Sequence, residues 1–342
     1  MRLLSMLHGS SSHRRKGALI DSLFDIDHAQ KTSKITSQQP TLGAPGHFLG
    51  SSINTAEIVI TLQDNSALAL GTYLGGSIAL YLISITDKDG LLLTDAPRTE
   101  VFPRFLYESV EHGPNEGRQR QCHVHQMLED KRGLLYAPDL GSDRVWILRR
   151  DKMNFEICDW LLCPRGTGSR HAVLTPDGLE TIMYVIGELS HTVVAFDLST
   201  PPAEAIQPID DFAPNIIPPT VHPDHQFMID SADICLHPTI PNVLYVSNRW
   251  ERHIAQRDPH LKNVPEELPP GDDVAIILLS SDGRKVENMK HVRTNVDVIR
   301  GMRLNEDGKF VVVVVGQEGG GVEILMDQWG ERRRVDARGR LE

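Results

Sequence analysis

Arginine, histidine and acidic side chains recur at two kinds of position in this 342-residue chain. Some stand where short apolar runs begin, and others stand in the polar turns that follow a second apolar run. Guanidinium groups bind carboxylate or phosphate through paired hydrogen bonds, so arginines around one cavity favour an anionic ligand. The substrate-binding candidates are Arg170, Arg249, His171, Asp233, Arg300 and Gln317, and the acid–base candidates are His125 and Glu188.

The same residues also have structural explanations, which the sequence leaves open. Arg170 and Arg249 could form ion pairs between neighbouring sheets, and Glu188 could be a solvated turn residue. His125 could be a core histidine, and we expect Trp250 to be a packing residue rather than a stacking platform. Composition and spacing alone therefore indicate an anion site without assigning each residue a role.

No covalent nucleophile or metal centre is indicated. The chain has no GxSxG motif, and no base is placed beside Cys122. His123 and His125 stand two positions apart, as two metal ligands on one strand would, but no third ligand follows at a clear spacing. We therefore expect neither a metal site nor a cofactor.

Five stretches that share one pattern must position these side chains. In the clearest copy, residues 170–197, three apolar runs at 172–174, 182–186 and 192–196 are divided by a Pro-Asp-Gly turn and a second polar turn. Short β-branched runs divided by turn residues predict antiparallel strands. The other copies start at His125, Ala232, Arg300 and, in weaker form, Ala56; the copy from Ala232 is followed by a loop at 257–272 and a further strand at 274–279.

The spacing of these copies predicts an all-β fold. Equivalent turns lie roughly 50 to 70 residues apart, and repeats of several strands at such periods are typical of a β-propeller. The chain shows no helical periodicity, which argues against a doubly wound α/β fold. In a propeller sheet, the start of the first strand and the turn after the second lie on one face. The candidate residues are therefore expected to converge at the mouth of the central channel.

Composition limits the classes of partner. The formal net charge of −11 argues against a general nucleic-acid binder. No apolar run approaches the roughly 18 residues of a membrane helix. The four cysteines show no CxxC spacing, which favours reduced thiols in an intracellular protein. The basic, serine-rich first 20 residues could be a disordered tail or a mitochondrial transit peptide, so we expect a cytoplasmic protein, with the mitochondrion as the alternative. The sequence gives no oligomeric state.

Four phrases carry a resemblance to a known family. They are HVHQMLEDKRGLLYAPDL from His123, GSRHAVLTPDG from Gly168, VIGELSHTVVAFD from Val185 and LYVSNRWERHIAQ from Leu244. Together with the glycine-rich stretch from Ile299, they resemble the lactonase family of seven-bladed β-propellers. That family includes the propeller-type 6-phosphogluconolactonase and the carboxy-cis,cis-muconate cyclase. The resemblance covers about residues 45–328 and implies a channel site at His125, Arg170, Glu188 and Arg249.

The expected organisation follows from this resemblance. Residues 1–41 should hold little regular structure or one irregular strand pair, residues 42–328 should form the propeller, and residues 329–342 should be a charged tail. The segment before Gly46 is shorter than the family's one to two blades of sequence there. Either this segment forms a degraded blade or the seven-bladed ring is incomplete at the N-terminus.

The leading functional hypothesis is hydrolysis of an anionic sugar lactone, as in a 6-phosphogluconolactonase. The partner would be a small anionic lactone or carboxylate, without nucleic acid or membrane. A carboxymuconate-type cycloisomerase is the first alternative, because it needs the same anion clamp and acid–base pair. A non-catalytic propeller with a relict site is the second.

Overall fold

The computed structural model describes most of the chain and divides it into two compact units. The N-terminal unit comprises Met1–His112, Glu116–Ser142 and Trp146–Cys158, and the C-terminal unit comprises Gly113–Asn115, Asp143–Val145 and Asp159–Glu342. The described residues are 20–27, 32–40, 59–61, 66–86, 90–93, 98–101, 113–151, 154–176, 181–199, 206–251, 263, 267, 269–304, 308, 310–315, 322–326 and 332–333.

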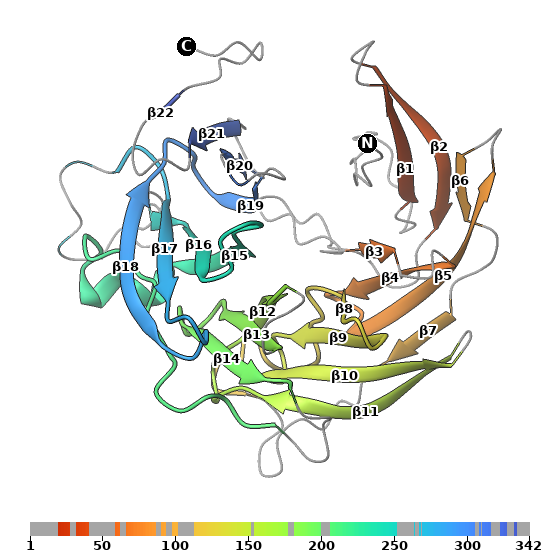
Figure 1. Ribbon diagram of the computed structural model, residues 1–342, viewed down its shortest axis with the longest axis horizontal. Helices are drawn as coiled ribbons and strands as arrows, with labels where there is room; N and C mark the ends of the chain where they lie inside the picture. The colour runs from red at the N-terminus through yellow and green to blue at the C-terminus, as the bar shows by residue number, and fades with distance from the viewer. Residues whose placement is uncertain are drawn as a thin grey trace. The chain divides into compact units, whose positions relative to one another are not determined.

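The first sheet is an antiparallel pair of strands, 20–27 with 32–40, whose register shifts between Leu23 and Phe24. This pair lies in the segment expected to hold little regular structure or one irregular strand pair. A second sheet has the order β3-β4-β5-β6, with β7 also paired to β5, and a third has the order β11-β10-β9-β8 (Figure 1). The strands are β1 (Ile20–Asp27), β2 (Thr32–Pro40), β3 (Val59–Thr61), β4 (Ala67–Thr72), β5 (Ser77–Thr86), β6 (Gly90–Leu93), β7 (Arg98–Val101), β8 (Leu128–Glu129), β9 (Leu134–Asp139), β10 (Arg144–Asp151) and β11 (Asn154–Leu162).

Three further antiparallel sheets follow in the C-terminal unit. Their orders are β12-β13-β14, β15-β16-β17-β18 and β19-β20-β21-β22, so each is a meander of sequence neighbours (Figure 1). Their elements are β12 (Ser169–Leu174), β13 (Ile182–Gly187), β14 (Val193–Asp197), the 3₁₀ helix η1 (Pro223–Met228), β15 (Asp230–Leu236), β16 (Val243–Arg249), β17 (Asp273–Leu279), β18 (Val286–Arg293), β19 (Ile299–Leu304), β20 (Phe310–Val315), β21 (Val322–Met326) and β22 (Arg332–Arg333).

The predicted strands are confirmed in the copies from Arg170 and Arg300, but the copy from Ala232 needs a correction. We expected the strand at 274–279 to follow that copy. The structure pairs Val243 of β16 directly with Leu278 of β17, so this strand is the third of the same sheet. Residues 250–272 therefore connect the second and third strands of this sheet, because the strands before and after them pair directly.

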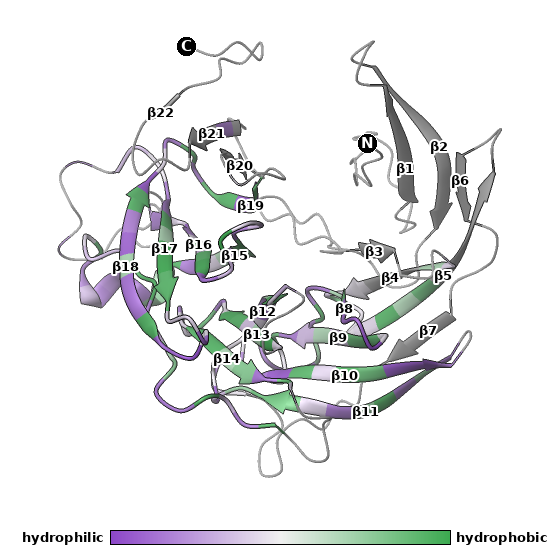
Figure 2. Cartoon of the chain, viewed as in Figure 1, coloured by the Kyte–Doolittle hydropathy of each residue, from purple (hydrophilic) through white to green (hydrophobic). Residues whose placement is uncertain are grey.

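The sheets of the C-terminal unit are held by apolar side chains between them. All six residues of β13 are buried, whereas β18 has exposed positions along its length, and Figure 2 shows the same contrast in hydropathy. One buried cluster joins Tyr184 and Ile186 of β13 to Val246 of β16 and Ile277 of β17. Each such large apolar side chain stabilises the fold by roughly 1.5–3 kcal/mol when fully buried. In the part of the chain that the structure describes, no helix is long and apolar enough to cross a membrane.

Candidate active site

A buried group of three charged side chains lies in the C-terminal unit. The carboxylate of Glu188 contacts two guanidinium groups: its Oε2 lies 2.8 Å from Arg170 Nε, and its Oε1 accepts a hydrogen bond of 2.7 Å from Arg249 Nη2. All three side chains are almost fully buried. We call Arg170, Glu188 and Arg249 the arginine clamp. It brings together three of the residues predicted from the sequence to form the site.

Strand ends position the clamp. Arg170 is the second residue of β12, Glu188 follows the last residue of β13, and Arg249 is the last residue of β16. The backbone N–H of Ser231 donates to the Glu188 carbonyl over 3.3 Å, which ties the turn after β13 to the start of β15. Two neighbouring sheets thus contribute to one ion-paired group.

A β-bulge near the start of β12 turns a second side chain toward the clamp. The register shifts between Ser169 and Ala172, so β12 holds one residue more than β13 there. Neighbours on a regular strand point to opposite faces, and a bulge re-aims them. Arg170 Nη1 accordingly lies 3.2 Å from His171 Nδ1. Equivalent shifts occur on β15 between Ser231 and Ile234 and on β19 between Ile299 and Gly301.

His171 and Asp233 form a buried pair that links three sheets. His171 Nδ1 lies 2.8 Å from Asp233 Oδ1, and Asp233 Oδ2 accepts hydrogen bonds from Met302 N at 2.8 Å and Arg303 Nη1 at 3.2 Å. Burial alone would raise the pKa of Asp233, but His171, Arg303 and the Met302 N–H together hold that pKa below its usual value. The pair therefore positions the ring of His171 beside Arg170.

Asp233 should make stability depend on pH in the acid range. A carboxyl group with a lowered pKa in the folded state stabilises the fold above its unfolded-state pKa of 3.8, and this contribution is lost as pH falls toward the folded-state value. Asp233→Asn is expected to lower the free energy of unfolding at pH 7, and the difference from wild type should shrink below about pH 4. Urea unfolding across this range measures it. A difference that stays constant with pH would contradict the assignment.

His125 belongs to the N-terminal unit, where it is buried against an aromatic residue. Its ring centroid lies 4.6 Å from that of Tyr73, and its backbone N–H donates to the Pro138 carbonyl over 3.0 Å. Tyr73 also stacks on His123 with a centroid distance of 4.3 Å. Gln317, another predicted binding residue, lies outside the described residues.

Two features beside the clamp were not predicted. Asp230 Oδ2 lies 3.5 Å from Arg249 Nη2, so a second carboxylate lies near the guanidinium group. Arg300, predicted to bind substrate, lies with its guanidinium carbon 5.7 Å from the ring centroid of Trp250. Asp230 is the first residue of β15 but is followed by Ser231, so no apolar run marks it in the sequence. The arginine–tryptophan contact has no sequence signal either.

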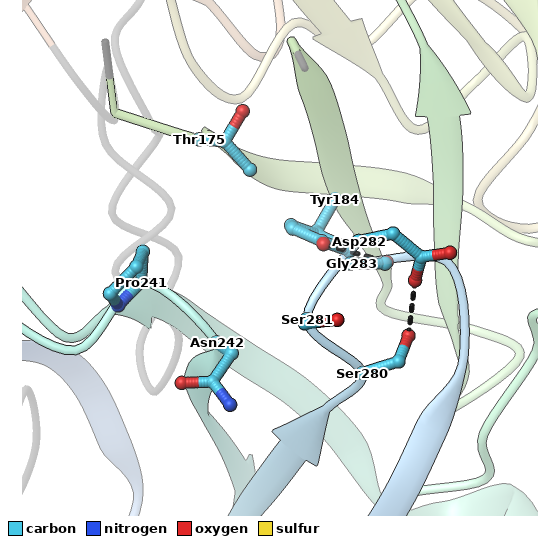
Figure 3. A pocket seen from close by; sticks show the side chains of 8 residues that line it. All are labelled: Thr175, Tyr184, Pro241, Asn242, Ser280, Ser281, Asp282 and Gly283. Carbon is cyan, nitrogen blue, oxygen red and sulfur yellow. Dashed lines mark hydrogen bonds between the residues drawn. The ribbon is translucent and has the colours of Figure 1, made fainter. Parts of the chain in front are cut away.

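A separate cavity of about 460 Å³ lies elsewhere in the C-terminal unit (Figure 3). Thr175 follows the end of β12 and Asn242 precedes β16, so this cavity is at the opposite strand ends from Arg170 and Arg249. Its polar lining is mainly hydroxyl and amide groups, with the carboxylate of Asp282. Among the described residues, the lining includes none of the predicted site residues and no lysine or arginine that could bind an anionic ligand, so we place the candidate site at the clamp. The lining residues are Thr175, Tyr184, Pro241, Asn242, Ser280, Ser281, Asp282 and Gly283.

Comparison with protein families identifies the chain. Residues 12–327 match the sequence model of the family described as lactonase, seven-bladed β-propeller. The chain belongs to this lactonase family. The predicted all-β propeller class is therefore confirmed for this lactonase-family protein. The match begins within the segment that we expected to precede the propeller. No curated protein sequence matches the chain.

Solved structures share the fold of this lactonase-family chain at low sequence identity. A Lactobacillus plantarum protein is 20% identical, with a TM-score of 0.66 over 96% of this chain and 78% of its own. The periplasmic gluconolactonase of Pseudomonas aeruginosa is 16% identical, with a TM-score of 0.65 over 96% and 77%. A candidate 6-phosphogluconolactonase of Bacteroides fragilis is 21% identical, with a TM-score of 0.61 over 95% and 78%.

Proposed function

We propose that this protein hydrolyses an anionic sugar lactone of the 6-phosphogluconolactone type. The observation that carries the proposal is the buried arginine clamp, in a chain of the lactonase family. Guanidinium groups recognise phosphate and carboxylate through directed N–H donors. Two structural neighbours are a gluconolactonase and a candidate 6-phosphogluconolactonase, which fits a sugar lactone. No comparison supports the cycloisomerase alternative. A location in the cytoplasm stays a prediction.

The charges of the clamp suggest how an anion would bind. Glu188 offsets one of the two guanidinium charges, and Asp230 lies near Arg249 as well. The two arginines are thus matched by two carboxylates, and the group has no excess positive charge that would attract the substrate. An incoming phosphate or carboxylate would compete with Glu188 for the guanidinium N–H donors. Substrate binding would thereby loosen the Glu188 carboxylate from its ion pairs and leave it able to accept a proton.

The proposed reaction needs one proton acceptor and one proton donor. A water oxygen attacks the lactone carbonyl carbon and gives its proton to Glu188. The tetrahedral intermediate then breaks the bond between the carbonyl carbon and the ring oxygen, and the ring oxygen leaves with the proton that Glu188 took from water, which restores the carboxylate. The products are the open-chain hydroxy acid and the regenerated side chain. An acid–base role for His125, beside that of Glu188, is supported only by the resemblance to the lactonase family.

The test is hydrolysis of 6-phosphoglucono-δ-lactone, corrected for the spontaneous reaction. Arg170→Ala is expected to lower kcat/KM about a hundredfold, because a charge-assisted, bidentate contact to the substrate is lost. Arg170→Lys should recover only part of this, since an ammonium group lacks the planar fork. His125→Ala should lower kcat. Arg149→Ala, at an exposed position of β10, is the matched control and should keep wild-type kinetics.

The outcomes separate the hypotheses. A folded wild-type protein without activity on this lactone would contradict the lactonase proposal. Turnover of a muconate-type substrate instead would favour the cycloisomerase. A cooperative unfolding transition with no turnover of either substrate would favour a non-catalytic propeller.

A further inference from the structure

Trp250 has a backbone conformation that its side chain disfavours. Its φ is +79°, in the left-handed region that glycine adopts freely and bulky residues rarely occupy. Such a conformation persists only where the surrounding structure imposes it, and it is found at binding and catalytic sites. The backbone strain at Trp250 therefore points to a functional role for the indole ring.

The residues on both sides of Trp250 are fixed by strong contacts. Arg249 is held by Glu188. The backbone N–H of Glu251 donates to Asp272 Oδ1 over 3.1 Å, and the Glu251 carboxylate pairs with Arg293. These contacts hold the turn after β16 in place and impose the conformation of Trp250.

Consecutive residues of this turn reach toward different sheets. Arg249 points to Glu188, at the end of β13 in the preceding sheet. The Trp250 ring lies under the guanidinium group of Arg300, from β19 in the following sheet. Trp250 thus directly follows Arg249 of the arginine clamp in sequence, and a third arginine, Arg300, lies over its ring.

Trp250 differs from a tryptophan that serves packing. Trp146 is 5% exposed, and its Nε1 donates to Asp139 over 2.9 Å. Trp250 is only partly buried. Packing would not require a strained backbone at an accessible position, because a side chain with ordinary φ could fill the space.

We propose that Trp250, with Arg300, is a platform for the ring of the substrate, whose anionic group is held at Arg249. The inference rests on the proposed lactonase function and specifies its substrate as a six-membered, hydroxylated ring. One face of such a ring carries C–H bonds, whose positive edges suit the negative π face of indole. The arginine clamp recognises the anionic group, and Trp250 recognises the closed ring.

Two stable probes separate ring recognition from anion recognition. Glucose 6-phosphate has a pyranose ring and a phosphate, and 6-phosphogluconate carries the phosphate on an open chain. Trp250→Leu keeps apolar bulk but loses the π face. It is expected to weaken glucose 6-phosphate binding about tenfold, within the range of aromatic stacking contacts, and to change 6-phosphogluconate binding less than about twofold. Trp250→Phe should bind both probes within about threefold of wild type.

Trp160→Leu is the matched control, because Trp160 also lies beneath an arginine. Its ring centroid is 5.3 Å from the guanidinium carbon of Arg144, and it stands on the outer strand β11. This variant should bind both probes as wild type does. Calorimetry gives the dissociation constants, and thermal unfolding checks that each variant is folded.

The possible results separate the platform from the lactonase function. Wild-type binding of both probes by folded Trp250→Leu, with lactone hydrolysis intact, would overturn the platform and leave the lactonase function standing. Equal weakening of both probes would also overturn it, because a structural disturbance of Arg249 would then explain the loss. A wild-type protein that neither binds the probes nor hydrolyses the lactone would overturn both.

Discussion

Glu188→Gln is expected to destabilise the protein by about 3–5 kcal/mol, the usual cost of removing one partner from a buried ion pair. Glu188 is fully buried and lies within 2.8 Å of both guanidinium groups. The glutamine side chain has nearly the same shape, so packing is kept while the negative charge is lost. Arg170 and Arg249 would then remain buried with less compensation. Urea unfolding at pH 7 measures the change.

The same variant also tests the proton acceptor. If Glu188 takes the proton from water, the amide cannot replace it, and kcat falls even under conditions where the variant is fully folded. Glu287→Gln, at an exposed position of β18, provides the control for the substitution itself. Unchanged stability in Glu188→Gln would mean that the arginines are not held by this carboxylate. Unchanged kcat would remove Glu188 from the reaction.

Asp139→Ala should be a second severely destabilising change, within the N-terminal unit. The buried Asp139 carboxylate accepts hydrogen bonds from His123 N at 2.6 Å, Gly141 N at 3.0 Å, Ser142 Oγ at 2.6 Å and Trp146 Nε1 at 2.9 Å. An unsatisfied buried polar group costs about 1–3 kcal/mol, and such costs add incompletely. We therefore expect a loss of about 3–5 kcal/mol.

The comparison of two aspartates makes this result interpretable. Asp151→Ala, at the exposed end of β10, should change the free energy of unfolding by less than about 0.5 kcal/mol. Asp139→Asn should fall between wild type and Asp139→Ala, since its amide oxygen keeps some of the acceptor geometry. If Asp139→Ala and Asp151→Ala had equal stability, the hydrogen-bonded turn would not be a support of this sheet.

The sequence by itself determined the strands and their antiparallel order where a copy was uninterrupted. The run at 182–186 lies within β13 and the run at 192–196 ends within β14, because β-branched runs and turn residues act locally. Arg170, Glu188 and Arg249 were nominated for the same reason, since each stands at a strand start or a turn. The spacing of the copies predicted a β-propeller, the resemblance added the seven-bladed lactonase family, and the family comparison confirmed both.

Only the tertiary structure decided which strands pair across an insertion and where adjacent side chains point. Strand β17 joins β16 because pairing depends on the whole sheet, whereas the sequence between them breaks the local pattern. The bulge that brings Arg170 and His171 together depends on register with β13, and alternation along one strand cannot reveal it. The left-handed backbone of Trp250 is likewise imposed by contacts of Arg249 and Glu251, which come from other elements.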